Sequence, residues 1–381
     1  MSIRERVDHW MFEAYALDVR SLGIARILVG TYVVLYRPVR LRWIDSMPEP
    51  FFRPPPGPLR LLGGIPSSGV LTVTSVGLCI AAVALLFGFH TRIASAAAGL
   101  LLFLTDGLTY SFGHVHHSGT FLAALLLIMA ASDWGAAYSV DALRHGERTG
   151  TGNGWPVALA AMLLAGLMLT GTLPKAATGW LDPSLLAARA QIVHQHFTQP
   201  GQGLLGNFPL RTTSALFWKP LDYLTLFLEL GFLIALASPR AFRVFCAGAV
   251  VFHFAIFIAF GIEFTANVVT YAVFFEWSVV VDRIHGAELR TRAGAVRSRL
   301  AAHRAFVGLF ALTIGVAVSI ATDRIGPPVV YVAQRFAARP TWAASVVVFA
   351  VAVPLALGYL VFRARAAFSP VRSRLLLKAP P

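Results

Sequence analysis

The chain has 381 residues, of which 57% are hydrophobic and 13% are charged, and its mean hydropathy is +0.68. A soluble chain would carry about 25% charged residues, so this composition disfavours a soluble enzyme. The net charge is +14, but the basic residues are spread over many short segments, which disfavours a nucleic-acid-binding protein. Membrane topology explains the excess of positive charge better, because cytoplasmic loops of membrane proteins collect Lys and Arg; contact with the anionic headgroups of the lipid bilayer follows from it.

The chain opens with a mixed aromatic and charged segment. Residues 9–20 combine aromatic and apolar side chains such as Trp10 with charged side chains, which is typical of an amphipathic helix at a membrane interface. A first span is expected over 21–36, retained rather than cleaved as a signal peptide. Prolines in 48–64 would break a helix, so this segment is predicted to form a loop or a re-entrant element.

Nine further apolar runs follow, which gives about ten transmembrane helices. They are expected at 70–89, 93–110, 119–132, 155–173, 222–238, 242–261, 264–281, 305–321 and 343–362. The predicted fold is therefore an all-α, polytopic membrane bundle without a large soluble domain. Its expected parts are an interfacial helix (1–20), a transmembrane bundle (21–281), and two further spans with a basic cytoplasmic loop and tail (282–381).

The distribution of Lys and Arg predicts the orientation. With ten alternating spans, most basic residues fall on the side of the N-terminus. Cytoplasmic loops collect such residues, so both termini are expected in the cytoplasm, with the spans in the inner membrane of a bacterial cell. The connections at 111–118 and 174–221 and the turn near Glu263 then share the outer side.

Several ionisable side chains fall within or beside the expected spans, where a charge is costly and often functional. They are Arg26, Asp106, Asp133, Lys175, Glu229, His253, Glu263 and Glu276. The structural alternative for Arg26 is an ion pair inside the bundle, with Glu229 or Asp106 as its partner. His253 could equally be a hydrogen-bonded bundle residue rather than a ligand.

Lys175 lies where an apolar span gives way to a long connection. It could simply extend to the membrane interface. Alternatively, a lysine whose charged form is destabilised by desolvation can act as a base at neutral pH. Asp133 and Asp141 follow another span, and both could cap helices.

Residues 110–120 read YSFGHVHHSGT and contain His114, His116 and His117. A second pair lies at 194–196, so five histidines fall on the expected outer side. Imidazole would suit zinc or iron. Membrane di-iron sites need HxxxH and HxxHH boxes, and the chain has neither. We therefore expect no metal.

The segment 114–143, HVHHSGTFLAALLLIMAASDWGAAYSVDAL, resembles the signature of the vitamin K-dependent γ-carboxylase-like superfamily, which includes the bacterial HTTM (horizontally transferred transmembrane domain) proteins. In that signature a His-Ser pair opens a short apolar helix, and a Ser-Val-Asp-Gly-Leu segment follows it. Here His117-Ser118 opens the helix, and Ser-Val-Asp-Ala-Leu at 139–143 closes the segment.

The resemblance continues in the following spans. The family's next span ends in a Lys-Lys-Leu-Asp-x-x-Trp-like segment, whose second lysine matches Lys175 of PKAATGW. Pro174 replaces the first lysine, and two alanines replace Leu-Asp. A later pair of family spans carries an acidic residue and then a histidine, which correspond to Glu229 and His253.

The resemblance implies an enzyme that uses a reduced naphthoquinone, similar to vitamin K, and oxygen. Lys175 would be the base, with His117 and His253 orienting quinone or oxygen. Further residues implied in binding quinone or substrate are Arg26, Asp106, Glu229, His116 and Trp180. The carboxylases carry a large lumenal domain that has no counterpart here, so epoxidation is favoured over carboxylation of a peptide glutamate.

Two other functions stay open. A branch of the same superfamily, the sporulation-delaying toxin maturation component, suggests a non-redox membrane factor that matures or exports a secreted peptide. A transporter is the third alternative, with Arg26, Glu229 and Asp106 along its path. A transporter would favour an inverted repeat with broken helices, and the sequence shows no convincing one.

Overall fold

A computed structural model describes residues 2–37, 41–113, 117–198, 207–282, 315 and 340–368. Within these ranges the secondary structure is helical, and one isolated β-bridge joins Asp18 to Thr151. The all-helical prediction is thereby confirmed for the described part of the chain. The chain forms two compact units, which are described separately: the first comprises 1–167 and 269–344, and the second comprises 168–268 and 345–381.

Among the described residues, six helices are long and apolar enough to cross a membrane. They are Val19–Tyr36 (α2), Ser68–Phe87 (α3), Thr91–Tyr110 (α4), Trp155–Ala177 (α7), Pro239–Phe260 (α11) and the Ser345–Arg365 part of Pro340–Phe368 (α16). Each coincides with a predicted span. The chain thus has the composition and helix lengths of a multi-pass membrane protein.

Two of the other predicted spans form helices that differ from the expectation. The run at 119–132 lies in His117–Met129 (α5), whose 13 residues fall short of the roughly 20 that a span needs. The run at 222–238 lies in Ala215–Ala235 (α10), which is long enough but contains three charged residues. These are Lys219, Asp222 and Glu229.

The predicted span at 264–281 does not form a single helix. The run at 264–281 begins with the short helix Thr265–Thr270 (α12). It continues as the 3-10 turn Tyr271–Phe274 (η5), so the α-helix ends after six residues. The run at 305–321 lies outside the described residues except for position 315.

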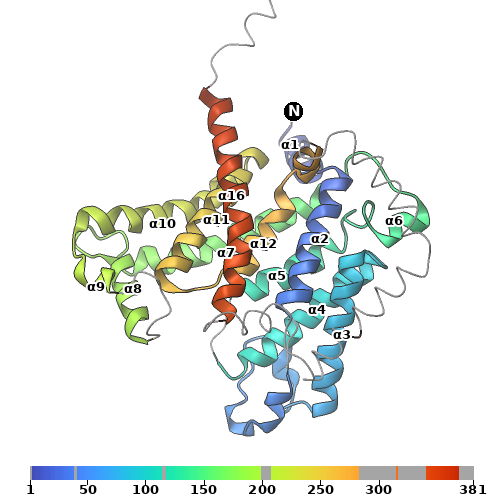
Figure 1. Ribbon diagram of the computed structural model, residues 1–381, viewed down its shortest axis with the longest axis horizontal. Helices are drawn as coiled ribbons and strands as arrows, with labels where there is room; N and C mark the ends of the chain where they lie inside the picture. Colours follow the sequence, from blue (N-terminus) through green and yellow to red (C-terminus); the bar gives the residue numbers. More distant parts are fainter. Residues whose placement is uncertain are drawn as a thin grey trace, which may run out of the picture. The chain divides into compact units, whose positions relative to one another are not determined.

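In the first unit, α2, α3, α4 and α5 pack against one another in chain order (Figure 1). Glycines permit the close approach: a Cβ on Gly30 would lie 2.8 Å from the Cα of Leu86, and one on Gly99 would lie 2.9 Å from the Ala123 carbonyl oxygen. Helix α3 ends at Gly88, which adopts the left-handed conformation with φ 66°. The chain then reverses within three residues into α4.

The proline-rich segment of the first unit closes one end of α4 without forming a span. It folds into three short 3-10 helices, Arg42–Ser46 (η2), Glu49–Phe51 (η3) and Pro58–Leu61 (η4). A cluster of apolar side chains beneath them comprises Leu41, Ile44, Leu71 and Leu108. The backbone N–H of Arg53 donates to the Ser111 carbonyl at 2.8 Å. The loop prediction for this segment is confirmed.

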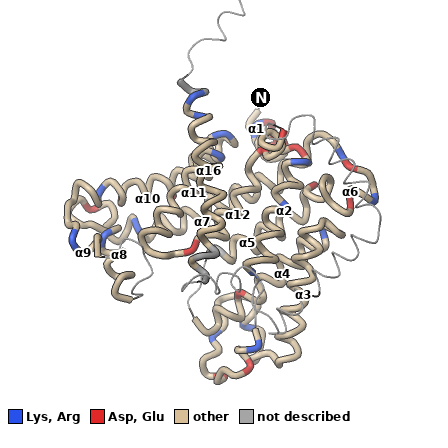
Figure 2. The backbone as a smooth tube through the Cα atoms, viewed as in Figure 1, with Lys and Arg blue, Asp and Glu red and all other residues tan. Residues whose placement is uncertain are grey.

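The N-terminal segment of the first unit forms Ile3–His9 (α1) and the π-helical turn Trp10–Ala14 (η1). Apolar side chains of Ile3, Val7 and Phe12 are exposed, as an interfacial helix requires. Figure 2 shows charged residues gathered around α1 and around Val140–His145 (α6), whereas α3 and α4 are uncharged along most of their length. Contact of α1 with a membrane stays a prediction.

In the second unit, α10 packs against α11 and against Ala187–Thr198 (α8). The connection after α7 therefore contains α8, the short helix Phe208–Arg211 (α9) and the beginning of α10. The buried Asp222 carboxylate accepts hydrogen bonds from the backbone N–H groups of Ala187 and Ala188, at 3.2 and 2.7 Å. This carboxylate caps α8 and fixes it to α10.

Candidate functional site

The second unit contains an ion pair between two helices of membrane-spanning length. The ammonium of Lys175, in the last turn of α7, donates to Oε1 of Glu229 in α10. The Lys175 side chain is 30% exposed and that of Glu229 is 12% exposed. Both groups are thus partly removed from water, and the lysine remains accessible from one side.

Neighbouring residues enclose this pair. The hydroxyl of Thr172, one turn before Lys175, lies 3.4 Å from Oε2 of Glu229. The indole of Trp180 lies under the Lys175 ammonium, 5.5 Å from nitrogen to ring centroid, an arrangement that favours the cation. His253 of α11 is buried and lies near enough to Lys175 for the two groups to interact electrostatically.

His253 has an aromatic environment. Its ring stacks on Phe264, with a centroid distance of 4.5 Å and an interplanar angle of 26°. Phe264 follows Gly261, whose left-handed conformation (φ 71°) ends α11 and turns the chain back. The turn beside Glu263 therefore positions an aromatic ring against His253.

The second unit thus brings together Lys175, Glu229, Trp180 and His253, which are half of the predicted site residues. Sequence reasoning missed Thr172, although its spacing of three from Lys175 places both on one face of a helix. A carboxylate, an amine, a hydroxyl and an imidazole in this arrangement can hold and transfer a proton.

The other described site residues lie in the first unit. Asp106, near the end of α4, forms an ion pair with Arg37, which directly follows α2. A Cβ on Gly119 would overlap the Asp106 carboxylate, so the first turn of α5 lies against this ion pair. Arg37 is the second functional candidate that sequence reasoning missed, because it lies beyond the expected span.

Of the histidines predicted at 114–117, the structure describes only the backbone position of His117. His117 begins α5, two residues before Gly119. His114, His116 and the side chain of His117 lie outside the described residues. Among the residues that are described, no group of three or more His, Cys, Asp or Glu side chains could hold a metal ion.

The expected ion pair of Arg26 with Glu229 or Asp106 is wrong. The Arg26 guanidinium is fully buried and donates to four backbone carbonyls: Leu85 (2.7 Å), Leu86 (2.6 Å), Trp134 (3.1 Å) and Tyr138 (2.6 Å). It satisfies carbonyls at the end of α3 and in the loop after α5. Arg26 is therefore a structural residue, and its donors are occupied.

The capping prediction is correct for one aspartate. Asp141 accepts from the backbone N–H of His90 (2.9 Å) and of Thr91 (2.7 Å), so it caps α4. Burial acts to raise the pKa of Asp141, but the hydrogen bonds from Thr91 and His90 outweigh it and lower the pKa below the ordinary value of an aspartate. Asp133 instead accepts from Arg148 and from the backbone N–H of Asn153.

No protein-family model matches this chain, and searches of curated proteins and of solved structures also found no significant match. The resemblance to the carboxylase-like superfamily therefore stays a prediction.

Proposed function

We propose that this protein is a multi-pass membrane enzyme, similar to the vitamin K-dependent carboxylases, in which Lys175 and Glu229 accept a proton from a reduced naphthoquinone. The observation that carries the proposal is the pairing of a lysine on α7, a candidate span, with a glutamate 54 positions away on α10, beside Trp180 and His253. Ionisable groups at such positions are costly and are usually retained for function.

The residues around Lys175 and Glu229 fit a reduced naphthoquinone. Trp180 offers an aromatic surface next to an amine and a carboxylate, and the exposed side of Lys175 leaves the amine reachable. A bound reduced naphthoquinone would supply an ionisable hydroxyl and the electrons that oxygen takes up. Since Lys175 donates to Glu229, the first step is a proton shift from Nζ to Oε1, which leaves two neutral groups in a weakly polar site.

The neutral amine of Lys175 can then accept a proton and become an ammonium again. This ammonium stabilises the negative charge that the departing proton leaves behind. The Thr172 hydroxyl lies 3.4 Å from the Glu229 carboxylate as a further polar group, and His253 interacts electrostatically with Lys175. Thr172 and His253 are buried, which limits the water that could compete for the proton on this side of the ion pair.

The proposed location is the inner membrane, with both termini cytoplasmic and about ten membrane segments in total. The described arginines of the first unit support it, because more of them lie on the side of the N-terminus than at the other end of α2 and α3. The six on the first side are Arg4, Arg6, Arg20, Arg92, Arg144 and Arg148, and the four on the second are Arg37, Arg42, Arg53 and Arg60. Such gathering of arginine is typical of a cytoplasmic side. Lys175, at the opposite end of α7 from Trp155, would then face outward.

The test is oxygen consumption by the purified full-length protein with reduced naphthoquinone. The variants are Lys175→Ala and Lys175→Arg. Arginine keeps the positive charge beside Glu229 but does not give up its proton near neutral pH. We expect quinone-dependent uptake by the wild type and its loss in both variants, with unchanged elution on size exclusion.

Activity of Lys175→Arg would contradict the role of Lys175 as a base. Absence of quinone-dependent uptake by the folded wild type would overturn the enzymatic proposal. The non-redox factor for a secreted peptide would then be favoured, and a neighbouring gene for a small secreted peptide would support it.

A further inference from the structure

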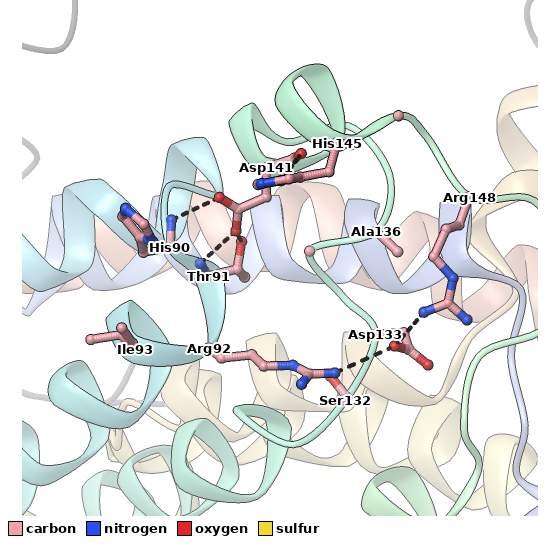
Figure 3. Close-up of a pocket in the computed structure, with 13 residues that line it drawn as sticks. His90, Thr91, Arg92, Ile93, Ser132, Asp133, Ala136, Asp141, His145 and Arg148 are labelled. Carbon is pink, nitrogen blue, oxygen red and sulfur yellow. Dashed lines mark hydrogen bonds and ion pairs between the residues drawn. The ribbon is translucent and has the colours of Figure 1, made fainter.

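The first unit contains an open pocket outside the site described above. It lies where α3 meets α4 and where α5 gives way to α6, and its volume is about 530 Å³. Its charged and polar lining includes His90, Arg92, Asp133, Asp141, His145 and Arg148. Figure 3 shows Arg92 and Arg148 extending toward Asp133 from two sides of this pocket.

The two arginines are only partly neutralised. Both approach the same oxygen of Asp133, at 2.8 Å for Arg148 and 3.8 Å for Arg92. One carboxylate therefore faces two guanidinium groups. The side chains of Arg92 and Arg148 are 73% and 62% exposed, so most of their N–H donors are available to a ligand.

The second carboxylate of the pocket, that of Asp141, does not neutralise the second guanidinium group. Asp141 is committed to the backbone N–H groups of His90 and Thr91 and to the Thr91 hydroxyl. Its charge also acts on the buried guanidinium of Arg26. Asp141 is thus balanced by the start of α4 and by Arg26, so its charge adds little to that of Asp133 beside the arginine pair.

The position of the pocket indicates which kind of anion can bind there. Helix α4, a candidate span, begins at Thr91, so Arg92 lies at the level where lipid headgroups are expected. Guanidinium groups recognise phosphate through paired N–H donors. Basic pockets between membrane helices bind anionic headgroups.

We propose that Arg92 and Arg148 bind the phosphate of an anionic phospholipid headgroup in this pocket. Asp133 keeps the two guanidinium groups near each other in the absence of lipid. A headgroup phosphate then takes the exposed donors on both. The loop between α6 and α7, which carries Arg148, is thereby held against the first turn of α4.

Thermal unfolding of the detergent-purified full-length protein tests this proposal. The probes are phosphatidylglycerol, phosphatidylcholine at the same mole fraction, and inorganic phosphate against chloride at equal ionic strength. Binding to the folded state raises the unfolding temperature. We expect phosphatidylglycerol to raise it by on the order of 2–5 °C more than phosphatidylcholine does.

The informative variant is Arg92→Gln/Arg148→Gln, in which this difference should disappear. The matched control is Arg144→Gln, which removes an exposed arginine of the same region that stacks on Phe89 and does not line the pocket. It should respond like the wild type. If the double variant fails to fold, Arg92→Gln alone should lose about half of the shift, because Arg92 is the more exposed and less tightly paired arginine.

Three results would overturn the proposal. The first is equal stabilisation of the wild type by the two lipids. The second is an equal loss in Arg144→Gln and in the double variant, which would indicate attraction by net charge alone. The third is stabilisation by inorganic phosphate without any by phosphatidylglycerol, which would assign the pocket to a soluble phosphate-bearing ligand.

Discussion

Arg26 in the first unit and Lys175 in the second are both cations on membrane-type helices, but their surroundings differ. Arg26 is fully buried and donates to four backbone carbonyls. No carboxylate contacts it among the described residues, and the charge that acts on it most comes from Asp141. Lys175 contacts one carboxylate and is 30% exposed.

The difference indicates that the charge of Arg26 stabilises the fold, whereas that of Lys175 can take part in proton transfer. The guanidinium bonds of Arg26 join carbonyls at the end of α3 to carbonyls of the loop after α5, so the residue connects these two segments. Lys175 has a single partner that can accept its proton. The Glu229 carboxylate can take up a proton from Lys175, which is open on one side, whereas the backbone carbonyls that hold Arg26 cannot accept a proton from it.

The largest expected effect is that of Arg26→Met. It removes the buried guanidinium from the carbonyls of the α3 end and of the loop after α5, and should lower the free energy of unfolding by about 3–5 kcal/mol. Thermal unfolding in detergent measures the loss. Arg240→Met, at an exposed position at the start of α11, serves as control and should change stability by less than about 0.5 kcal/mol. Equal melting of the two variants would contradict the structural role of Arg26.

A smaller loss is expected for Gly88→Ala. Gly88 has φ 66°, and an added Cβ would overlap the side chain of Ser139 and lie 2.8 Å from Nη1 of Arg26. The strain should cost about 1–3 kcal/mol. Gly166→Ala in α7 is the control, because no atom lies within 4 Å of the added Cβ, and it should be neutral or stabilising. An unaffected Gly88→Ala protein would show that α3 and the Arg26 network can move apart.

Lys175→Met is expected to affect stability less than either change in the first unit. An ion pair that is partly open to solvent contributes about 1 kcal/mol or less. A double-mutant cycle with Glu229→Gln, followed by thermal unfolding, measures the coupling directly. A loss as large as that of Arg26→Met would remove the distinction between the two cations and would make Lys175 a structural residue.

The smallest effect concerns Asp141 and pH. Its pKa is lowered from the ordinary value of an aspartate because the hydrogen bonds from Thr91 and His90 outweigh burial. A carboxyl whose pKa is lowered by folding contributes stability above about pH 4, and this contribution is lost as the pH falls through the folded-state pKa. We therefore expect the unfolding temperature of the wild type to fall more between pH 5 and about pH 3 than that of Asp141→Asn. Parallel pH profiles would contradict the cap.

The sequence alone determined where most helices form. Apolar runs of about 20 residues predicted α2, α3, α4, α7, α11 and α16, since hydropathy and length are local properties. Gly88 and Gly261, which end two of these helices, are also local signals. The same criterion was less successful for α5, which has 13 residues where a span of about 20 was expected.

Only the tertiary structure decided which polar groups meet. The partners of Arg26 lie 59 to 112 positions away and are backbone carbonyls, which carry no signature in the sequence. The choice of Glu229 for Lys175 and of Arg37 for Asp106 likewise depends on how helices pack side by side. Hydropathy identifies a charge that needs a partner, but the partner is set by the packing of distant segments.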